Sequence, residues 1–349
     1  MDISIRHARG RTRRHMTADR NQAINGFLAA NGWSNAERES LAGDASFRRY
    51  ERVVRNTGEN VVLMDAPPPQ EDVRPFVTIA RHLTKLGLSA PRILAADEDQ
   101  GFLLLEDLGD GTYTHLLAAG HDEEALYALA TDALIHLHKT PEADAIPKGV
   151  MDYDEGRLLE EVDRLNVWYL PMVDAAPLAV DARETYLDLW RNILPAAWQT
   201  PSSLILFDYH VDNLLLLADR TGVAACGLLD FQDAVHGPVT YDLMSLLEDA
   251  RRDINPVLVA NMKARYRTAF PSITDSDFET SWAVMAAQRH IRVLGTFARL
   301  KVRDRKPHYL EHMPRLWRYM ESCLTHPVLA PLKEWLDTHV PADLRVISE

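Results

Sequence analysis

A group of polar residues interrupts a long apolar stretch of the sequence, SLILFDYHVDNLLLL, at residues 203–217. Asp208, His210, Asp212 and Asn213 lie between two runs of apolar residues. Buried strands do not normally carry four polar side chains between apolar runs. The pattern therefore predicts two short strands joined by a polar loop, and the residue types in that loop indicate what it does.

The spacing of these residues fits a phosphoryl transfer that depends on a metal ion. Asn213 follows Asp208 by five positions, and Asp230 ends another apolar run, GLLDFQDA, 22 residues after Asp208. Such a reaction needs a carboxylate that orients and deprotonates the attacking hydroxyl, with an amide and a second carboxylate that hold magnesium against the phosphates. We expect Asp208 to be the base and Asn213 and Asp230 to be the metal ligands. The alternative is a solvated turn, in which Asp and Asn are common.

The length and the periodicity of the chain predict two lobes. At 349 residues the chain exceeds the size at which a single core stops growing. Residues 17–107 contain a helix pattern at 19–31, two predicted strand pairs and a helix at 72–86 between them. Residues 108–349 are mostly helical, with helices expected at 122–139, 154–169, 181–198, 240–252, 256–269, 278–302 and 308–323. The expected fold class is α+β, with a small antiparallel sheet lobe and a larger helical lobe.

The composition narrows the classes of partner and compartment. A formal net charge of -13 disfavours nucleic acid as the main partner, because a phosphate backbone binds basic surfaces. Cys226 and Cys323 cannot form a disulfide framework, which favours a reducing compartment. No apolar run reaches the roughly 18 residues that cross a bilayer, and the basic start lacks the apolar core of a secretory signal. We expect a cytoplasmic protein with a small-molecule substrate, no membrane partner, and a disordered basic tail at residues 1–16.

Three motifs in the second half of the chain resemble a known superfamily. FDYHVDN, LLDFQD and GPVTYDL are similar to the catalytic loop, the metal-binding loop and the following helix of the aminoglycoside phosphotransferase and choline kinase-like superfamily, which shares the protein-kinase fold. Longer strings, including LAGDASFRRYERV and QRHIRVLGTFARL, resemble the bacterial kinases that phosphorylate N-acetylmuramate and N-acetylglucosamine at C1 in cell-wall recycling. The resemblance implies a two-lobed kinase-like fold, ATP and Mg²⁺ as cofactors, and a sugar 1-phosphate as the product.

Residues outside the base and its metal ligands also have expected roles. The resemblance implies that Asp242 bonds the backbone of the catalytic loop, and that the backbone from Glu106 to Leu108 bonds adenine. We assign His210 and Asp233 to the substrate side of the site. The alternatives for His210 are a hydrogen-bonded loop residue or a zinc ligand, and the alternative for Asp233 is an ordinary loop residue.

Two arginines of a predicted helix are candidates for recognising an acidic substrate. Arg289 and Arg292 are three positions apart, so they could form a fork for the lactyl carboxylate of N-acetylmuramate. The alternative is an amphipathic helix that turns a charged face to solvent.

The sequence departs from the superfamily where the nucleotide phosphates are usually held. Met64 stands in place of the strand lysine and Phe76 in place of its glutamate partner, so no single buried charge is left unpaired. The missing lysine leaves open a pseudokinase that acts as a binding module. A phosphotransferase for an aminoglycoside or a choline-like alcohol also remains open.

The phosphate charge must then be met by other groups. The candidates are Arg48 and Arg49 with the backbone of the GDAS turn, in which Gly43 permits a tight bend and Ser46 supplies a hydroxyl. Neighbouring residues on a strand face opposite sides, so we expect only one of the two arginines to reach the phosphates.

Overall fold

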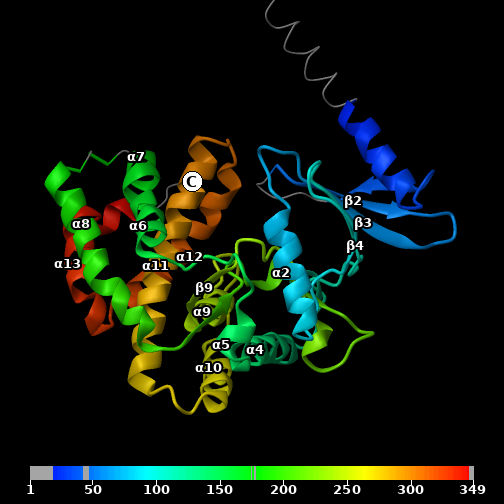
Figure 1. Cartoon of the computed structure of the whole chain (residues 1–349). Coiled ribbons are helices and arrows are strands. Elements are labelled where there is room, and N and C mark those ends of the chain that lie inside the picture. The colour runs from blue at the N-terminus through cyan, green and yellow to red at the C-terminus, as the bar shows by residue number, and fades with distance from the viewer. Residues whose placement is uncertain (1–18, 42–46, 174, 177, 346–349) are drawn as a thin grey trace, which may run out of the picture. The chain divides into compact units, whose positions relative to one another are not determined.

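The computed structural model describes most of the chain (Figure 1). The expected tail at residues 1–16 and the expected phosphate-binding residues Gly43 and Ser46 lie outside the described residues. The described ranges are 19–41, 47–173, 175–176 and 178–345.

The chain folds into two compact units. The first unit extends to Asp110 and also takes in Gly227–Leu229. The second unit consists of Gly111–Cys226 and the chain from Asp230 onward. The assignment of nucleotide binding to residues 17–107 and of sugar binding to residues 108–349 stays a prediction.

The first unit contains an antiparallel sheet with strand order β1-β2-β3-β5-β4 (Figure 1). The two predicted strand pairs are present, which confirms the expected α+β class. The strand β1 was not expected, because its sequence ERES has no apolar alternation and its side chains are largely exposed. It is a strand because it pairs with β2 at the edge of the sheet. The strands are β1 (Glu37–Ser40), β2 (Arg49–Val54), β3 (Asn60–Asp65), β4 (Ile93–Asp97) and β5 (Phe102–Leu105).

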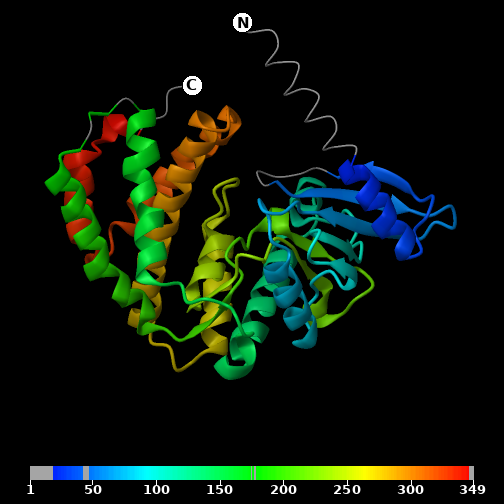
Figure 2. The ribbon, with the colours of Figure 1, turned by 45° about the horizontal axis from the view of Figure 1, so that its top comes forward.

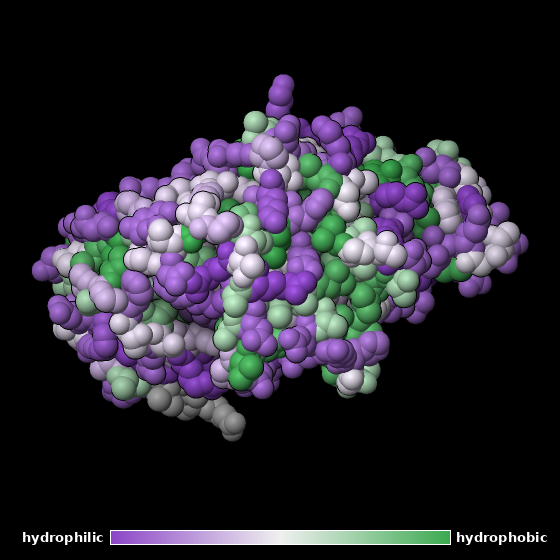
Figure 3. All heavy atoms as spheres, turned by 90° about the horizontal axis from the view of Figure 1, so that it is seen from below, coloured by the Kyte–Doolittle hydropathy of each residue, from purple (hydrophilic) through white to green (hydrophobic). Residues whose placement is uncertain are grey.

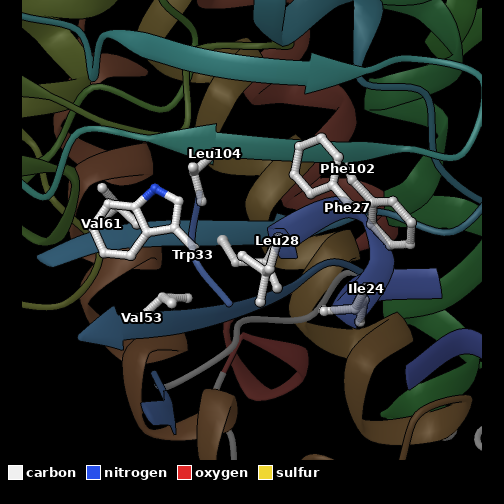
Figure 4. Packing of buried hydrophobic residues seen from close by; sticks show 9 residues of the cluster. Ile24, Phe27, Leu28, Trp33, Val53, Val61, Phe102 and Leu104 are labelled. Atoms are coloured by element: carbon white, nitrogen blue, oxygen red, sulfur yellow. The ribbon is translucent and has the colours of Figure 1, made fainter. Parts of the chain in front are cut away.

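A helix at residues 19–30 covers one face of this sheet. Ile24, Phe27 and Leu28 recur at helical spacing, and Figure 4 shows them turned toward side chains of the strands. The Phe27 ring lies 5.6 Å from the Phe102 ring of β5. The second helix of the unit, α2 (Arg74–Lys85), buries its own apolar face and is followed by Gly87 at φ +82°. The predicted helix pattern at 72–86 is therefore confirmed to within two residues.

The second unit is mainly helical, as expected (Figures 1 and 2). Its α-helices are α3 (Tyr113–Ala118), α4 (Glu123–Lys139), α5 (Glu142–Ala145), α6 (Glu155–Arg164), α7 (Leu170–Met172), α8 (Val180–Ile193), α9 (Thr240–Leu247), α10 (Pro256–Ala269), α11 (Asp275–Val302), α12 (Met313–Cys323) and α13 (Ala330–His339). Its strands are β6 (Ser202–Ile205), β7 (Leu214–Leu216) and β9 (Val235–Pro238). The strand β8 (Cys226–Leu228) begins in this unit with Cys226. A π-helical segment, η1 (Leu165–Tyr169), continues α6, and the 3-10 segments are η2 (Leu194–Gln199), η3 (Val211–Asn213), η4 (Gly222–Ala225), η5 (Pro307–His312), η6 (Pro327–Leu329) and η7 (Ala342–Leu344).

The long helix α11 is the centre of the second unit. It is buried along most of its 28 residues and packs against α6, α9 and α12. Figure 2 shows α6 in green beside α11 in orange. The two helices approach each other closely at Gly295, where an added Cβ would lie 2.6 Å from the carbonyl carbon of Arg164. A side chain at position 295 would therefore push the two helices apart.

The surface carries scattered apolar residues among polar ones. On the face drawn in Figure 3, hydrophobic residues in green are interrupted by hydrophilic residues in purple. Large apolar side chains exposed by half or more belong to different elements, for example Leu94 of β4, Val180 of α8 and Val257 of α10. Within the described ranges, the helices are too short or too polar to span a membrane.

Candidate active site

The polar loop of residues 206–213 follows β6, which pairs with β9 in an antiparallel ladder. The carboxylate of Asp242 in α9 accepts the backbone N–H groups of Leu206 at 2.5 Å and of Phe207 at 3.0 Å. Burial raises the pKa of Asp242 to about 7, and the two N–H donors oppose that rise. The expected bond between Asp242 and the backbone of this loop is therefore confirmed.

Phe207 gives the loop an unusual backbone conformation. Its φ is +75°, a value that bulky residues rarely adopt. Its ring stacks on Tyr241 at 5.5 Å and meets Tyr153 edge-on at 5.6 Å. Such strained backbone persists where the surroundings fix it and is concentrated at functional sites. The packed ring and the bonds to Asp242 thus fix the backbone immediately before Asp208.

The structure brings Asp208, His210 and Asn213 together. Asn213 Nδ2 donates to the carbonyl oxygen of Asp208 at 2.9 Å and lies 3.3 Å from His210 Nε2. Burial lowers the pKa of His210 well below its usual value, and the charges of neighbouring arginines lower it further. A neutral His210 can accept a hydrogen bond at Nε2, which fixes the Asn213 amide nitrogen on that side.

Asp230 follows β8, in a second loop with a positive φ of +55°. Gln232 Nε2 donates to Asp230 Oδ1 at 2.9 Å and to Asp233 Oδ2 at 3.2 Å. One amide therefore bridges the predicted metal ligand and the predicted substrate residue, while Asp233 itself is exposed.

Arg289 and Arg292 both lie buried on α11, not on a solvent-facing stripe. Arg289 Nη1 donates to the Glu248 carbonyl at 3.3 Å, and burial lowers the pKa of Arg289. Arg292 Nη2 lies 3.7 Å from Asp208 Oδ1. The alternative of an exposed charged face is wrong for these two residues. Of these two arginines, Arg292 forms an ion pair with the predicted base.

The other two polar residues of this loop, Asp212 and His210, contact different partners. Asp212 pairs with Arg251 at 3.1 Å and accepts a short hydrogen bond from Thr114, while His210 faces Asn213. Among the residues that the structure describes, no three His, Cys, Asp or Glu side chains are grouped as a metal site would require. The zinc alternative for His210 therefore has no support in the geometry.

In the first unit, the two predicted phosphate-binding arginines contact different acids. Arg49 Nη2 lies 2.6 Å from Asp65, and Arg48 Nε lies 3.6 Å from Glu71. The acid Asp65 is buried and also accepts from Arg20. These pairs give each arginine an acidic partner within its own unit.

The two positions at which the superfamily carries its lysine and its glutamate are buried. Met64 and Phe76 are at most 4% exposed, so both belong to the apolar core. In the predicted adenine-binding segment, the Glu106 N–H already donates to the Arg92 carbonyl at 2.8 Å, and Leu108 is half-buried.

Residues 37–287 match the sequence profile of the phosphotransferase enzyme family. The chain belongs to this family. A relative from Caulobacter vibrioides named N-acetylmuramate/N-acetylglucosamine kinase is 37% identical, over 95% of this chain and 99% of its own. A relative of the same name from Pseudomonas aeruginosa is 40% identical, over 89% of this chain and 91% of its own. The resemblance predicted from the motifs is confirmed, and so is the enzyme class.

Solved structures of this phosphotransferase's neighbours agree with the kinase-like fold. A choline/ethanolamine kinase family protein from Mesorhizobium loti has a TM-score of 0.59 at 14% identity, covering 91% of this chain and 99% of the neighbour. The ADP-bound aminoglycoside phosphotransferase APH(2″)-Ib has a TM-score of 0.56 at 15% identity, covering 88% and 98%. At this level of identity the comparison concerns the fold alone.

The sequence patterns did not single out Glu161 of this phosphotransferase, a buried acid that lies 4.0 Å from Arg292. Leu158, Val162 and Leu165 recur at helical spacing, and Glu161 lies on the same face of that pattern. The sequence therefore contained one signal for this residue, a glutamate on the apolar face of a predicted helix.

Proposed function

We propose that this phosphotransferase transfers the terminal phosphate of ATP to the C1 hydroxyl of N-acetylmuramate or N-acetylglucosamine, as part of peptidoglycan recycling. The observation that carries the phosphoryl-transfer chemistry is the loop on which Asp208 and Asn213 are joined by a hydrogen bond. The choice of acceptor rests on the relatives named for these two sugars, which match the chain along most of its length.

Asp208 is the proposed general base. Its side chain is 34% exposed, so a substrate hydroxyl can reach it, and its backbone is fixed by the strained turn before it. Asp208 accepts the proton of the C1 hydroxyl as the sugar oxygen bonds to the γ-phosphorus and the bond from that phosphorus to the ADP oxygen breaks.

Asn213 and Asp230 would hold Mg²⁺. The fit is chemical: the Asn213 nitrogen is used by the Asp208 carbonyl, so its amide oxygen is the atom left for a metal. Magnesium takes one or two protein oxygens together with phosphate oxygens and water, which an amide and a carboxylate satisfy. When bound, the ion neutralises the charge that develops on the transferring phosphoryl group.

The substrate side is assigned to the residues around the base. We place Arg289 and Arg292 against the lactyl carboxylate, because both are buried cations on one helix and Arg292 lies beside Asp208. His210 and Asp233 complete the substrate side. His210 supports Asn213 from within the loop, and Asp233 shares an amide with Asp230.

The nucleotide side is assigned to the first unit. The carbonyl of Glu106 and the N–H of Leu108 are the proposed partners of adenine. Arg48 or Arg49, with Gly43 and Ser46, is proposed to meet the phosphates in place of the missing lysine. We also place the enzyme in the cytoplasm, in keeping with its free cysteines.

An acceptor panel tests this function. Purified enzyme with Mg-ATP is assayed for ADP release in the presence of N-acetylmuramate, N-acetylglucosamine, kanamycin or choline. Release with the amino sugars, and a product that is stable to borohydride because C1 is blocked, would support the proposal. Release only with kanamycin or choline would reassign the acceptor. Nucleotide binding without release in any mixture would favour the pseudokinase.

A further inference from the structure

Glu161 of α6 is a buried carboxylate with no part in the chemistry described above. Its Oε2 accepts hydrogen bonds from the hydroxyl of Tyr153 at 2.5 Å and from Gln288 Nε2 at 2.9 Å. Its Oε1 accepts one from Arg157 Nε at 3.2 Å. All three partners donate, as the acceptor-only oxygens of an ionised carboxylate require.

Arg292 connects this carboxylate to the proposed base. Its Nε lies 4.0 Å from Glu161 Oε2, and its Nη2 lies 3.7 Å from Asp208 Oδ1. Both distances are longer than a hydrogen bond, and in the described part of the chain Arg292 Nε has no hydrogen-bond partner. The guanidinium is therefore held between two carboxylates by charge and packing.

The ring of Phe207 provides that packing. The guanidinium carbon of Arg292 lies 4.2 Å from the ring centroid, and that of Arg157 lies 4.5 Å from it. A cation over an aromatic ring is attracted to the electron density of the ring. These two arginines, which contact the residue before the base, are each paired with Glu161 as well.

We propose that Glu161 is a positioning residue that holds the Arg292 guanidinium beside Asp208, so that the Asp208 carboxylate stays turned toward the acceptor hydroxyl. A general base must lie within hydrogen-bond reach of the proton that it accepts, so a group that fixes the direction of its side chain affects turnover. The proposal rests on the assignment of Asp208 as base and is independent of which acceptor the enzyme uses.

A purely structural role for Glu161 predicts a different result. A buried charge serves stability no better than a well-packed apolar residue, and removing one member of a buried pair usually costs stability. If Glu161 only supported the fold, its loss would lower stability and scale all kinetic constants through the fraction of folded enzyme. A positioning role instead requires its effect on turnover to depend on Arg292.

A double-mutant cycle separates the two roles. The variants are Glu161→Gln, Arg292→Met and the double variant, assayed with whichever acceptor supports turnover in the wild type. Glu161→Gln is expected to lower kcat by at least tenfold, with the KM for ATP unchanged within twofold. In the Arg292→Met background the same change is expected to alter kcat by less than twofold, because the residue through which it acts is absent.

The number of nucleotide-binding sites supplies a second readout. Calorimetric titration with Mg-ATP counts the folded enzyme, so that kcat can be expressed per binding site, and Glu161→Gln should lower this kcat by at least tenfold. Glu161→Asp keeps the charge while shortening the side chain, and should lower it less. Glu160→Gln is the matched control, since Glu160 is 78% exposed on the same helix and should leave this kcat unchanged.

Two results would overturn the proposal. One is that the losses of the two single variants multiply in the double variant, and the other is that the loss of turnover in Glu161→Gln disappears when kcat is expressed per nucleotide-binding site. If Glu161→Gln does not fold, Glu161→Asp decides by the same two criteria. An inactive wild type on every acceptor would refute the kinase function itself, which is a separate result from additivity in an active enzyme.

Discussion

Replacing Gly295 by alanine should destabilise the second unit. An added Cβ would lie 2.6 Å and 2.7 Å from the backbone carbon and oxygen of Arg164, and backbone atoms cannot turn aside as a side chain can. Overpacking of a buried site typically costs 1–3 kcal/mol, and this contact belongs at the upper end, about 3 kcal/mol. Alanine regains about 1 kcal/mol of helix propensity over glycine. The net loss should be about 2 kcal/mol.

The assay is urea unfolding of Gly295→Ala beside a glycine that has room for a side chain. Gly26 is exposed within the helix at residues 19–30, and a Cβ there would meet nothing within 4 Å. Gly26→Ala should therefore stabilise the protein by about 0.5–1 kcal/mol, opposite in sign to Gly295→Ala. A Gly295→Ala variant as stable as the wild type, with normal turnover, would refute the argument from close packing.

Four further predictions concern the site and its surroundings. Asp208→Asn should keep the fold and ATP binding but lower turnover about 100-fold or more, as expected for loss of a general base; wild-type-like rates would remove Asp208 from that role. Asp230→Ala should abolish magnesium-dependent nucleotide binding, which calorimetry measures, and unchanged affinity would contradict the metal assignment. Of Arg48→Ala and Arg49→Ala, one should raise the apparent ATP constant while the other changes little; normal ATP kinetics in both would leave the phosphates to magnesium and backbone. Burial raises the pKa of Asp242 from 3.8 to about 7, so unfolding stability should fall as the pH rises between these values, and equal pH dependence in Asp242→Asn would count against this.

Local patterns predicted the elements whose own side chains show a period. The helix at residues 19–30 and the pair β2–β3 were found because their apolar residues recur at 3.6 or 2 residues. The strand β1 shows no such period, and only its pairing with β2 makes it a strand. The helix α13 was missed although Leu332, Trp335 and Leu336 recur at helical spacing, so in that case the sequence did contain the signal.

The sequence indicates which residues lie together where they belong to one short segment. Asp208 and Asn213 are five residues apart and could be paired from the sequence. Glu161 could not, because its partners Tyr153, Gln288 and Arg292 come from other segments and meet it only in the fold. A glutamate in a helix is ordinarily a surface residue, so its burial follows from tertiary contacts and not from its type.

The two arginines of α11 show why spacing alone does not assign a role. Positions three apart lie on neighbouring turns of a helix, so Arg289 and Arg292 had the same claim to a substrate carboxylate. In the structure their surroundings differ, since Arg289 donates to a backbone carbonyl and Arg292 lies between two carboxylates. A buried guanidinium whose Nε has no hydrogen-bond partner in the described residues costs free energy that an apolar side chain would avoid. That cost is explained if Arg292 acts on the base. Arg292→Lys keeps the charge without the planar fork, so in the ADP-release assay it should lower kcat less than Arg292→Met does, and equal losses in the two variants would contradict a role for the charge.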